Sequence, residues 1–258
     1  MTPEERFMFD LEGYLIIKNV LTPEAVKRLN EVADATFVRD YDDPGKDSKG
    51  RVGRRQVGRV SAWSPETQAL IDHPRILPYL IELLGPAFRL DHDYCIFMRP
   101  GAACGRLHGA PGGHTGSQRK YLYLEGEMLN GLSVVTFFLA DAKAGDGGFA
   151  CIPGSHKTNF GQNVPHEVRN FERVPDYMVQ PEVEAGDALI FTEALMHGTM
   201  PWRAGHERRA FLYKYAPGHL AYSNKFYNAD DYTNPSDQQR RVLTPPSAGR
   251  RPPVVQEV

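Results

Sequence analysis

The chain has 258 residues, of which 41% are hydrophobic, and its 30 Lys and Arg nearly balance 32 Asp and Glu, giving a formal net charge of −2. This composition is typical of an ordinary globular protein and lacks the extended basic face of a nucleic-acid-binding protein. No apolar run reaches the ~18 residues of a membrane span, and the acidic N-terminus differs from a signal peptide. We therefore expect neither a nucleic-acid nor a membrane partner.

The cysteines Cys95, Cys104 and Cys151 are odd in number and lack paired spacing. They predict free, mostly buried thiols rather than a disulfide framework. Together with the absence of a signal peptide, this pattern favours the cytoplasm.

The N-terminal third is predicted to be mainly helical. Residues 2–13 form a short helix with Thr2 as its N-cap, and residues 14–20 form a strand. Apolar residues at helical spacing predict a second helix over 22–38, and a third over 73–85 ends at Gly85. Helices therefore precede the rest of the fold.

A polar, glycine-rich stretch, residues 39–59, is predicted to be a long loop because it has too few apolar residues to pack. Its second half concentrates five basic side chains. They are Lys49, Arg51, Arg54, Arg55 and Arg59. The cluster is either a solvated surface or a lid that meets an anionic substrate, and the sequence leaves both interpretations open.

Beyond residue 87 the pattern changes to β-rich runs that are broken by Gly and Pro turns. The predicted fold class is an all-β core with flanking helices, in a single domain that spans residues 1–258. Within it, a helical region covers residues 1–86 and a β core covers residues 87–217. A polar, proline-rich tail, residues 218–258, is expected to lie extended.

Two histidines stand where predicted strands end, which is where sites open. His108 lies in a glycine-rich loop, and His197 closes the apolar run 188–197. Eleven residues after His197, Arg208 heads another strand, where a guanidinium could bind a carboxylate bidentately. The three residues together suggest a metal site beside an anion site.

The segment GGFACIPGSHK, residues 147–157, lies between the two histidines. With the opening FDLEGYLIIKNVLTPEAVKRL and the order His, His, Arg, it resembles the phytanoyl-CoA dioxygenase type of non-haem iron, 2-oxoglutarate-dependent oxygenases, over about residues 7–217. The resemblance implies a double-stranded β-helix, a cupin-like jelly roll. It also implies an oxidoreductase that uses Fe(II), 2-oxoglutarate and O2.

On this resemblance His108 and His197 are the iron ligands, and Arg208 pairs with the C5 carboxylate of 2-oxoglutarate. Thr199 matches a hydroxyl that contacts the same cosubstrate. Arg209 is the neighbour that could be confused with Arg208, because strand alternation turns only one of them inward.

The usual iron site of these enzymes has a carboxylate two residues after the first histidine. Here that position is Ala110. Members of the superfamily with Ala or Gly there include halogenases, which the sequence His-Gly-Ala resembles. In such a site chloride occupies the position beside Gly109 and Ala110, and a substrate radical takes chlorine instead of hydroxyl. The favoured interpretation is therefore a radical halogenase with Ala110 in its catalytic site.

Three alternatives stay open. A third ligand from elsewhere in the chain would give a hydroxylase with a non-standard metal site. The residues that could supply it are Asp141, Asp146, His114 and Glu193. On one strand Glu193 would lie about 13 Å from His197, which favours a substrate contact instead.

In the second alternative, water fills the open position of a hydroxylase. The third is a catalytically inactive jelly roll that only binds a ligand, and the intact His197, Thr199 and Arg208 argue against it.

The substrate is expected to be a small phosphorylated molecule. Arg54, Arg55 and Arg59 suit a phosphate group, and a free nucleotide, as in nucleoside-antibiotic biosynthesis, would satisfy them. A phosphopantetheine-tethered group on a carrier protein also carries phosphate and is the less favoured competitor.

Overall fold

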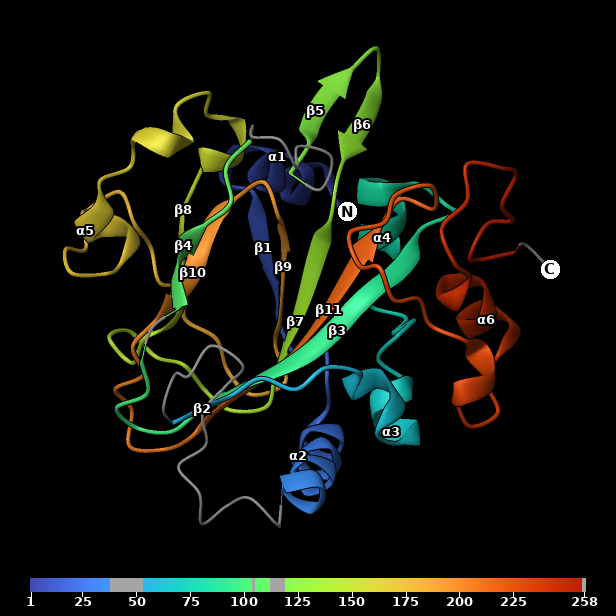
Figure 1. The fold of residues 1–258 in the computed structure, drawn as a ribbon, viewed down its shortest axis with the longest axis horizontal. Coiled ribbons are helices and arrows are strands. Elements are labelled where there is room, and N and C mark those ends of the chain that lie inside the picture. Colours follow the sequence, from blue (N-terminus) through green and yellow to red (C-terminus); the bar gives the residue numbers. More distant parts are fainter. Residues whose placement is uncertain (38–52, 104, 112–118, 257–258) are drawn as a thin grey trace.

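The computed structural model of the protein describes residues 1–37, 53–103, 105–111 and 119–256. The helices are α1 (Pro3–Glu12), α2 (Pro23–Phe37), α3 (Pro65–Gln68), α4 (Leu77–Leu84), α5 (His166–Arg169) and α6 (Asp237–Leu243). The strands are β1 (Tyr14–Ile17), β2 (Arg54–Arg55), β3 (Arg89–Met98), β4 (Gly105–His108), β5 (Tyr121–Leu124), β6 (Glu127–Asn130), β7 (Ser133–Phe138), β8 (Gly148–Ile152), β9 (Ala188–Thr192), β10 (Met196–Met200) and β11 (Arg208–Ala216). Longer helices precede the β core, as the sequence pattern predicts (Figure 1).

Two antiparallel sheets form the core. The larger has the strand order β1-β9-β7-β11-β3-β2, and the smaller has the order β4-β10-β8. Figure 1 shows the smaller sheet on one side of the larger sheet and helices α3, α4 and α6 on the other. This is the predicted jelly roll, in which the interior between the two sheets opens at one end.

Strand alternation divides the larger sheet into two faces, as β11 illustrates. Ala210 and Leu212 point between the sheets, where they join an apolar cluster. Phe211, Tyr213 and Tyr215 point to the opposite face, into a larger cluster that runs from the N-terminal helices to the C-terminal segment. Even-numbered positions of β11 therefore face the jelly-roll interior.

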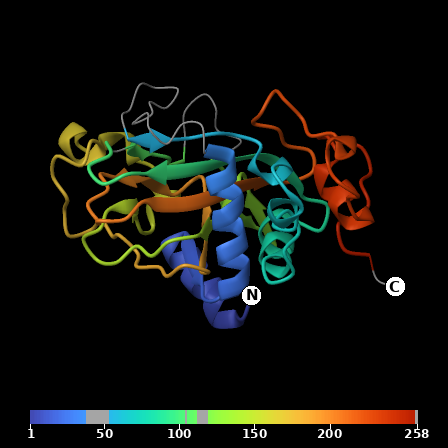
Figure 2. The same cartoon turned by 90° about the horizontal axis from the view of Figure 1, so that it is seen from below.

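The N-terminal helices cover the outer face of the larger sheet (Figure 2). Helix α1 begins with a capping box, in which the Thr2 and Glu5 side chains bond to each other's backbone N–H. It ends at Gly13, whose φ of 85° is left-handed. The predicted first and second helices are confirmed, and the third begins at Leu77, four residues later than expected.

The C-terminal segment corrects one expectation, because it is not extended throughout. Helix α6 begins after Ser236, whose side chain and that of Gln239 form a capping box, and it buries Val242 and Leu243. The polar composition of the tail concealed a cap followed by an apolar pair, which is enough to dock one short helix.

The described helices include none that is long and apolar enough to cross a membrane. Cys95 and Cys151 are buried free thiols, as predicted. Cys104 lies outside the described residues, as do Lys49 and Arg51 of the predicted basic loop.

Candidate active site

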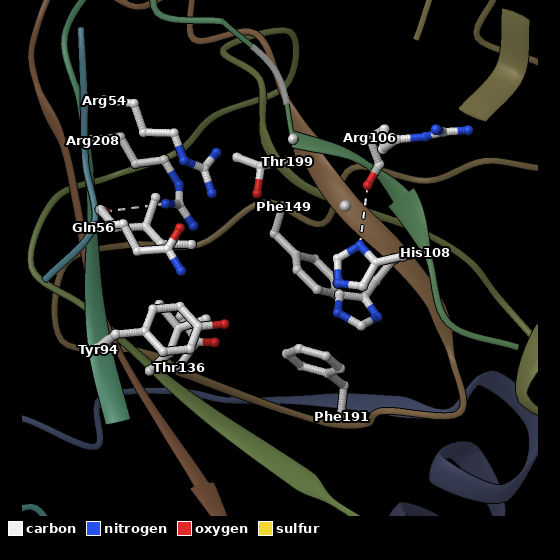
Figure 3. A pocket seen from close by; sticks show the side chains of 15 residues that line it. Arg54, Gln56, Tyr94, Arg106, His108, Thr136, Phe149, Phe191, Thr199 and Arg208 are labelled. Atoms are coloured by element: carbon white, nitrogen blue, oxygen red, sulfur yellow. Dashed lines mark hydrogen bonds between the residues drawn. The ribbon is translucent and has the colours of Figure 1, made fainter. Parts of the chain in front are cut away.

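A cavity of about 370 Å³ opens between the two sheets. The residues that line it are Arg54, Gln56, Tyr94, Ile96, Gly105, Arg106, His108, Thr136, Phe149, Phe191, His197, Gly198, Thr199, Arg208 and Leu212. Figure 3 shows Arg54 beside Arg208 at one end and His108 with Phe191 at the other. The cavity therefore has a histidine end and an arginine end.

His108 and His197 face each other across the paired strands β4 and β10. They are register partners, and their ring centroids lie 4.3 Å apart. Nδ1 of His108 lies 3.1 Å from the Arg106 carbonyl oxygen, and Nδ1 of His197 lies 2.7 Å from the Leu195 carbonyl oxygen. These bonds place a proton on each Nδ1, which leaves both Nε2 atoms free to bind a metal.

Both imidazoles are held in the neutral form that a metal requires. Burial and, to a lesser extent, the neighbouring His108 lower the pKa of His197 to about 3. Desolvation by the surrounding protein also lowers the pKa of His108.

Glu193 lies beside these histidines, which corrects the prediction that it is too far away to share an ion with His197. Its Oε1 is 3.8 Å from Nε2 of His197. The expected separation assumed one continuous strand, whereas β9 ends at Thr192 and the chain crosses to the other sheet before β10 begins at Met196. Within the crossing, the Leu195 N–H donates to the Thr192 carbonyl oxygen.

One donor atom from each of His108, Glu193 and His197 lies within 4.8 Å of the other two. Donors that share one divalent ion at bond lengths of about 2.0–2.2 Å lie about 3–4.4 Å apart. Two imidazoles and one carboxylate are also the donor set of non-haem Fe(II) oxygenases. These residues therefore fit an iron ion after small side-chain movements.

A buried ammonium accompanies the carboxylate. Lys214 Nζ on β11 donates to Glu193 Oε1 at 2.5 Å, and both side chains are less than a tenth exposed. Burial raises the pKa of the Glu193 carboxyl, but the charge and hydrogen bond of Lys214, together with the two histidines, outweigh burial and hold this pKa well below its usual range. The carboxylate is therefore ionised and available as a ligand.

Ala110 points away from this group. Gly109 has φ 106° and Ala110 has φ 67°, and these two left-handed residues end the alternation of β4. The Ala110 methyl joins an apolar cluster on the outer side of the smaller sheet, where a β-carbon at Gly161 would lie 2.2 Å from it. Neither Gly109 nor Ala110 is among the described residues that line the cavity.

Of the other candidate third ligands, Asp141 and Asp146 accept backbone hydrogen bonds from Ala185 and Lys143, respectively, and do not line the cavity. His114 lies outside the described residues. Among the described candidates, only Glu193 reaches the histidines.

Arg208 occupies the other end of the cavity, and Arg209 does not. Arg208 is buried, and its Nη1 donates to the Ile96 carbonyl oxygen at 3.3 Å while no described carboxylate pairs with it. Burial and the nearby Arg54 lower its pKa to about 9. Arg209 faces helix α2, where it pairs with Asp34 at 2.6 Å.

Thr199 lies two residues after His197 on β10 and also lines the cavity. A hydroxyl and a buried cation thus stand together opposite the histidines. A carboxylate would satisfy Arg208, whose Nε is buried without a hydrogen-bond partner among the described residues.

The three arginines predicted for substrate binding lie in different places, and only Arg54 lines the cavity. Arg54 is buried and lines the cavity, whereas Arg55 is half-buried and does not. Arg59 is exposed, pairs with Asp231 at 2.7 Å and lies over the Tyr227 ring, so it fastens the C-terminal segment instead.

Sequence reasoning missed Lys214, Tyr94 and Thr136. Lys214 and Thr136 stand in apolar strands, where a buried polar residue is a signal that could have marked them. Thr136 Oγ1 is buried without a described hydrogen-bond partner and faces the cavity.

The profile of the phytanoyl-CoA dioxygenase family matches residues 9–210. HygX from Streptomyces hygroscopicus, solved with nickel and 2-oxoglutarate, has a TM-score of 0.72 at 23% identity, over 89% of this chain and 93% of HygX. AviO1 from Streptomyces viridochromogenes Tue57 has a TM-score of 0.59 at 20% identity, over 81% and 92%.

SnoK, a non-heme alpha ketoglutarate dependent carbocyclase from nogalamycin biosynthesis, has a TM-score of 0.63 at 18% identity, over 85% of each chain. Among curated protein sequences, none matches the chain. The structural likenesses show the shared fold, and the profile covers most of the sequence. The chain therefore belongs to the phytanoyl-CoA dioxygenase family and is a non-haem iron, 2-oxoglutarate-dependent oxidoreductase.

Proposed function

We propose that the protein is a hydroxylase whose iron is held by His108, His197 and Glu193. The observation that carries this proposal is the position of Glu193, whose carboxylate lies within reach of both imidazoles. A carboxylate here supplies the charge and the ligand that Ala110 lacks. With Glu193 in the third protein-ligand position of the iron, no vacant position is left for a halide there, which favours hydroxylation over halogenation.

The remaining residues of the cavity divide the other tasks. Arg208 would bind the C5 carboxylate of 2-oxoglutarate through a charge-assisted pair, with the Thr199 hydroxyl beside it. Bound iron supplies oxygen activation coupled to oxidation of 2-oxoglutarate. The Phe191 and Phe149 rings, with centroids 4.6 and 6.2 Å from that of His197, cover the metal end and keep bulk water from it.

The substrate class that we propose is a small anionic molecule, with phosphorylated compounds such as nucleotides as the first candidates. Arg54 supports this choice, because a buried guanidinium on the cavity wall matches phosphate or carboxylate geometry. A cavity of about 370 Å³ admits 2-oxoglutarate and the reacting portion of such a molecule, which would leave its remainder at the mouth.

The experiment that tests the proposal is an anaerobic titration of the Fe(II) and 2-oxoglutarate complex with chloride, followed by its charge-transfer absorption. We expect no chloride-dependent shift in the wild type, because Glu193 occupies the position. In Glu193→Ala the position opens, and a saturable shift should appear.

A matched control is Glu184→Ala, which removes an exposed carboxylate that pairs with Lys143 outside the cavity. This variant should behave as the wild type does. A saturable shift in the wild type, with the same midpoint in Glu193→Ala, would overturn the proposal and assign halogenation instead.

A further inference from the structure

Lys214 is the one buried ammonium that contacts the proposed metal ligands among the described residues. It stands on the interior face of β11, and its Nζ lies 2.5 Å from Glu193 Oε1 and 5.4 Å from the centroid of the Tyr94 ring. The same Oε1 faces His197 Nε2 at 3.8 Å. The ammonium therefore holds the same carboxylate oxygen that faces the proposed metal ligand His197.

We infer that Lys214 is a positioning residue that sets the relative affinities of the site for its two charged ligands. It weakens the binding of the metal ion and strengthens the binding of 2-oxoglutarate. This inference rests on the proposed function, in which Glu193 ligates iron. A carboxylate oxygen can accept a hydrogen bond from Lys214 and bind a metal ion at the same time, but the shared oxygen is then a weaker metal ligand.

The charges of the site determine the direction of each effect. The charges of Glu193 and Lys214 cancel, so this pair adds no net charge beside a divalent cation and a dianionic cosubstrate. Without the ammonium the pair leaves one negative charge, which attracts the metal more strongly and repels 2-oxoglutarate. A structural role would predict something different, namely weaker binding of both ligands.

The test compares Lys214→Met, which keeps most of the length of the side chain and removes its charge, with Lys214→Arg, which keeps the charge. Affinities are measured anaerobically by calorimetry, first for Fe(II) alone and then for 2-oxoglutarate added to the Fe(II)-loaded protein. In Lys214→Met we expect the Kd for Fe(II) to fall about tenfold and the Kd for 2-oxoglutarate to rise about tenfold. Lys214→Arg should stay within about threefold of the wild type for both.

Lys214→Met leaves a buried carboxylate without its cation, so the variant could fail to fold. The double variant Glu193→Gln/Lys214→Met has no buried charge at this pair and keeps the inference testable. It should bind 2-oxoglutarate as the wild type does, because its net charge is the same, while Fe(II) binds more weakly for lack of the carboxylate.

Two results would overturn the inference: both affinities weakening together in Lys214→Met, or neither affinity changing. The proposed function fails separately, if Glu193→Gln alone leaves the Kd for Fe(II) unchanged. Succinate formation without added substrate gives a second readout, since Lys214→Met should need more 2-oxoglutarate to reach half its maximal rate.

Discussion

Two segments border the proposed metal site, and they differ in how they place a side chain. The segment after His108 keeps the expected spacing, yet Ala110 faces an outer apolar cluster. The segment before His197 has no recognised spacing, yet it brings the Glu193 carboxylate to within 3.8 Å of the imidazole. In a jelly roll, the place where the chain crosses between sheets can therefore provide a ligand that spacing along one strand would exclude.

Backbone conformation explains the contrast. Two left-handed residues in succession, Gly109 and Ala110, reverse the direction in which the second side chain points. A β-carbon at Gly109 would lie 2.2 Å from the Leu195 carbonyl oxygen, so the absence of a side chain there lets the two segments pack together. The turn that points the Ala110 side chain outward thus also makes room for the segment between β9 and β10, which contains Glu193.

The largest effect is expected from moving the carboxylate from one segment to the other. Glu193→Ala should weaken Fe(II) binding about 100-fold or more, because it removes a ligand rather than a supporting contact. The double variant Glu193→Ala/Ala110→Asp should not recover it, since position 110 points outward. Anaerobic titration with Fe(II) measures both, and recovery of affinity in the double variant would show that position 110 does reach the metal.

Ala110→Asp alone should act on stability rather than on metal binding. The new carboxylate would enter the cluster formed with Met196 and Val168, against Gly161, at a cost of about 2–4 kcal/mol. Chemical denaturation measures the loss, and Fe(II) affinity should be unchanged in the folded protein.

The control for this variant is Ala110→Gly, which suits the left-handed backbone at this position and should change stability by less than about 1 kcal/mol. If the Ala110→Asp protein were as stable as the wild type and bound Fe(II) more tightly, the side chain at position 110 would have to point toward the metal site and not outward.

At the other end of the cavity, the neighbours Arg208 and Arg209 should differ in the same way, because only Arg208 faces the interior. Arg208→Ala should raise the 2-oxoglutarate requirement about 10- to 100-fold, because it removes a charge-assisted pair of about 1.5–3 kcal/mol. Arg209→Ala removes contacts to Asn30 and Asp34 of α2 and should leave that requirement unchanged. Succinate formation as a function of 2-oxoglutarate concentration separates them, and the reverse pattern would exchange their roles.

The sequence predicts most of the fold and only a portion of the site. Helices, strands and the positions of His108, His197, Arg208 and Thr199 follow from periodicity and from resemblance to a family. Glu193 does not, because its place depends on where one sheet gives way to the other. Lys214 does not follow either, since its partner Glu193 lies in the crossing after β9, and β9 is not a neighbour of β11 in the sheet.

Arg59→Ala should have the smallest effect, and it tests which basic residues belong to the cavity. The exposed pair with Asp231 contributes about 0.2–1 kcal/mol and the contact with the Tyr227 ring about 0.5–1 kcal/mol, so the free energy of unfolding should fall by no more than about 2 kcal/mol. Affinity for 2-oxoglutarate and turnover should both be unchanged. Arg54→Ala, by contrast, alters the buried wall and should weaken binding of an anionic substrate or of 2-oxoglutarate. If Arg59→Ala impaired turnover as much as Arg54→Ala did, the cavity would have to extend to the C-terminal segment, and the division between the two arginines would be wrong.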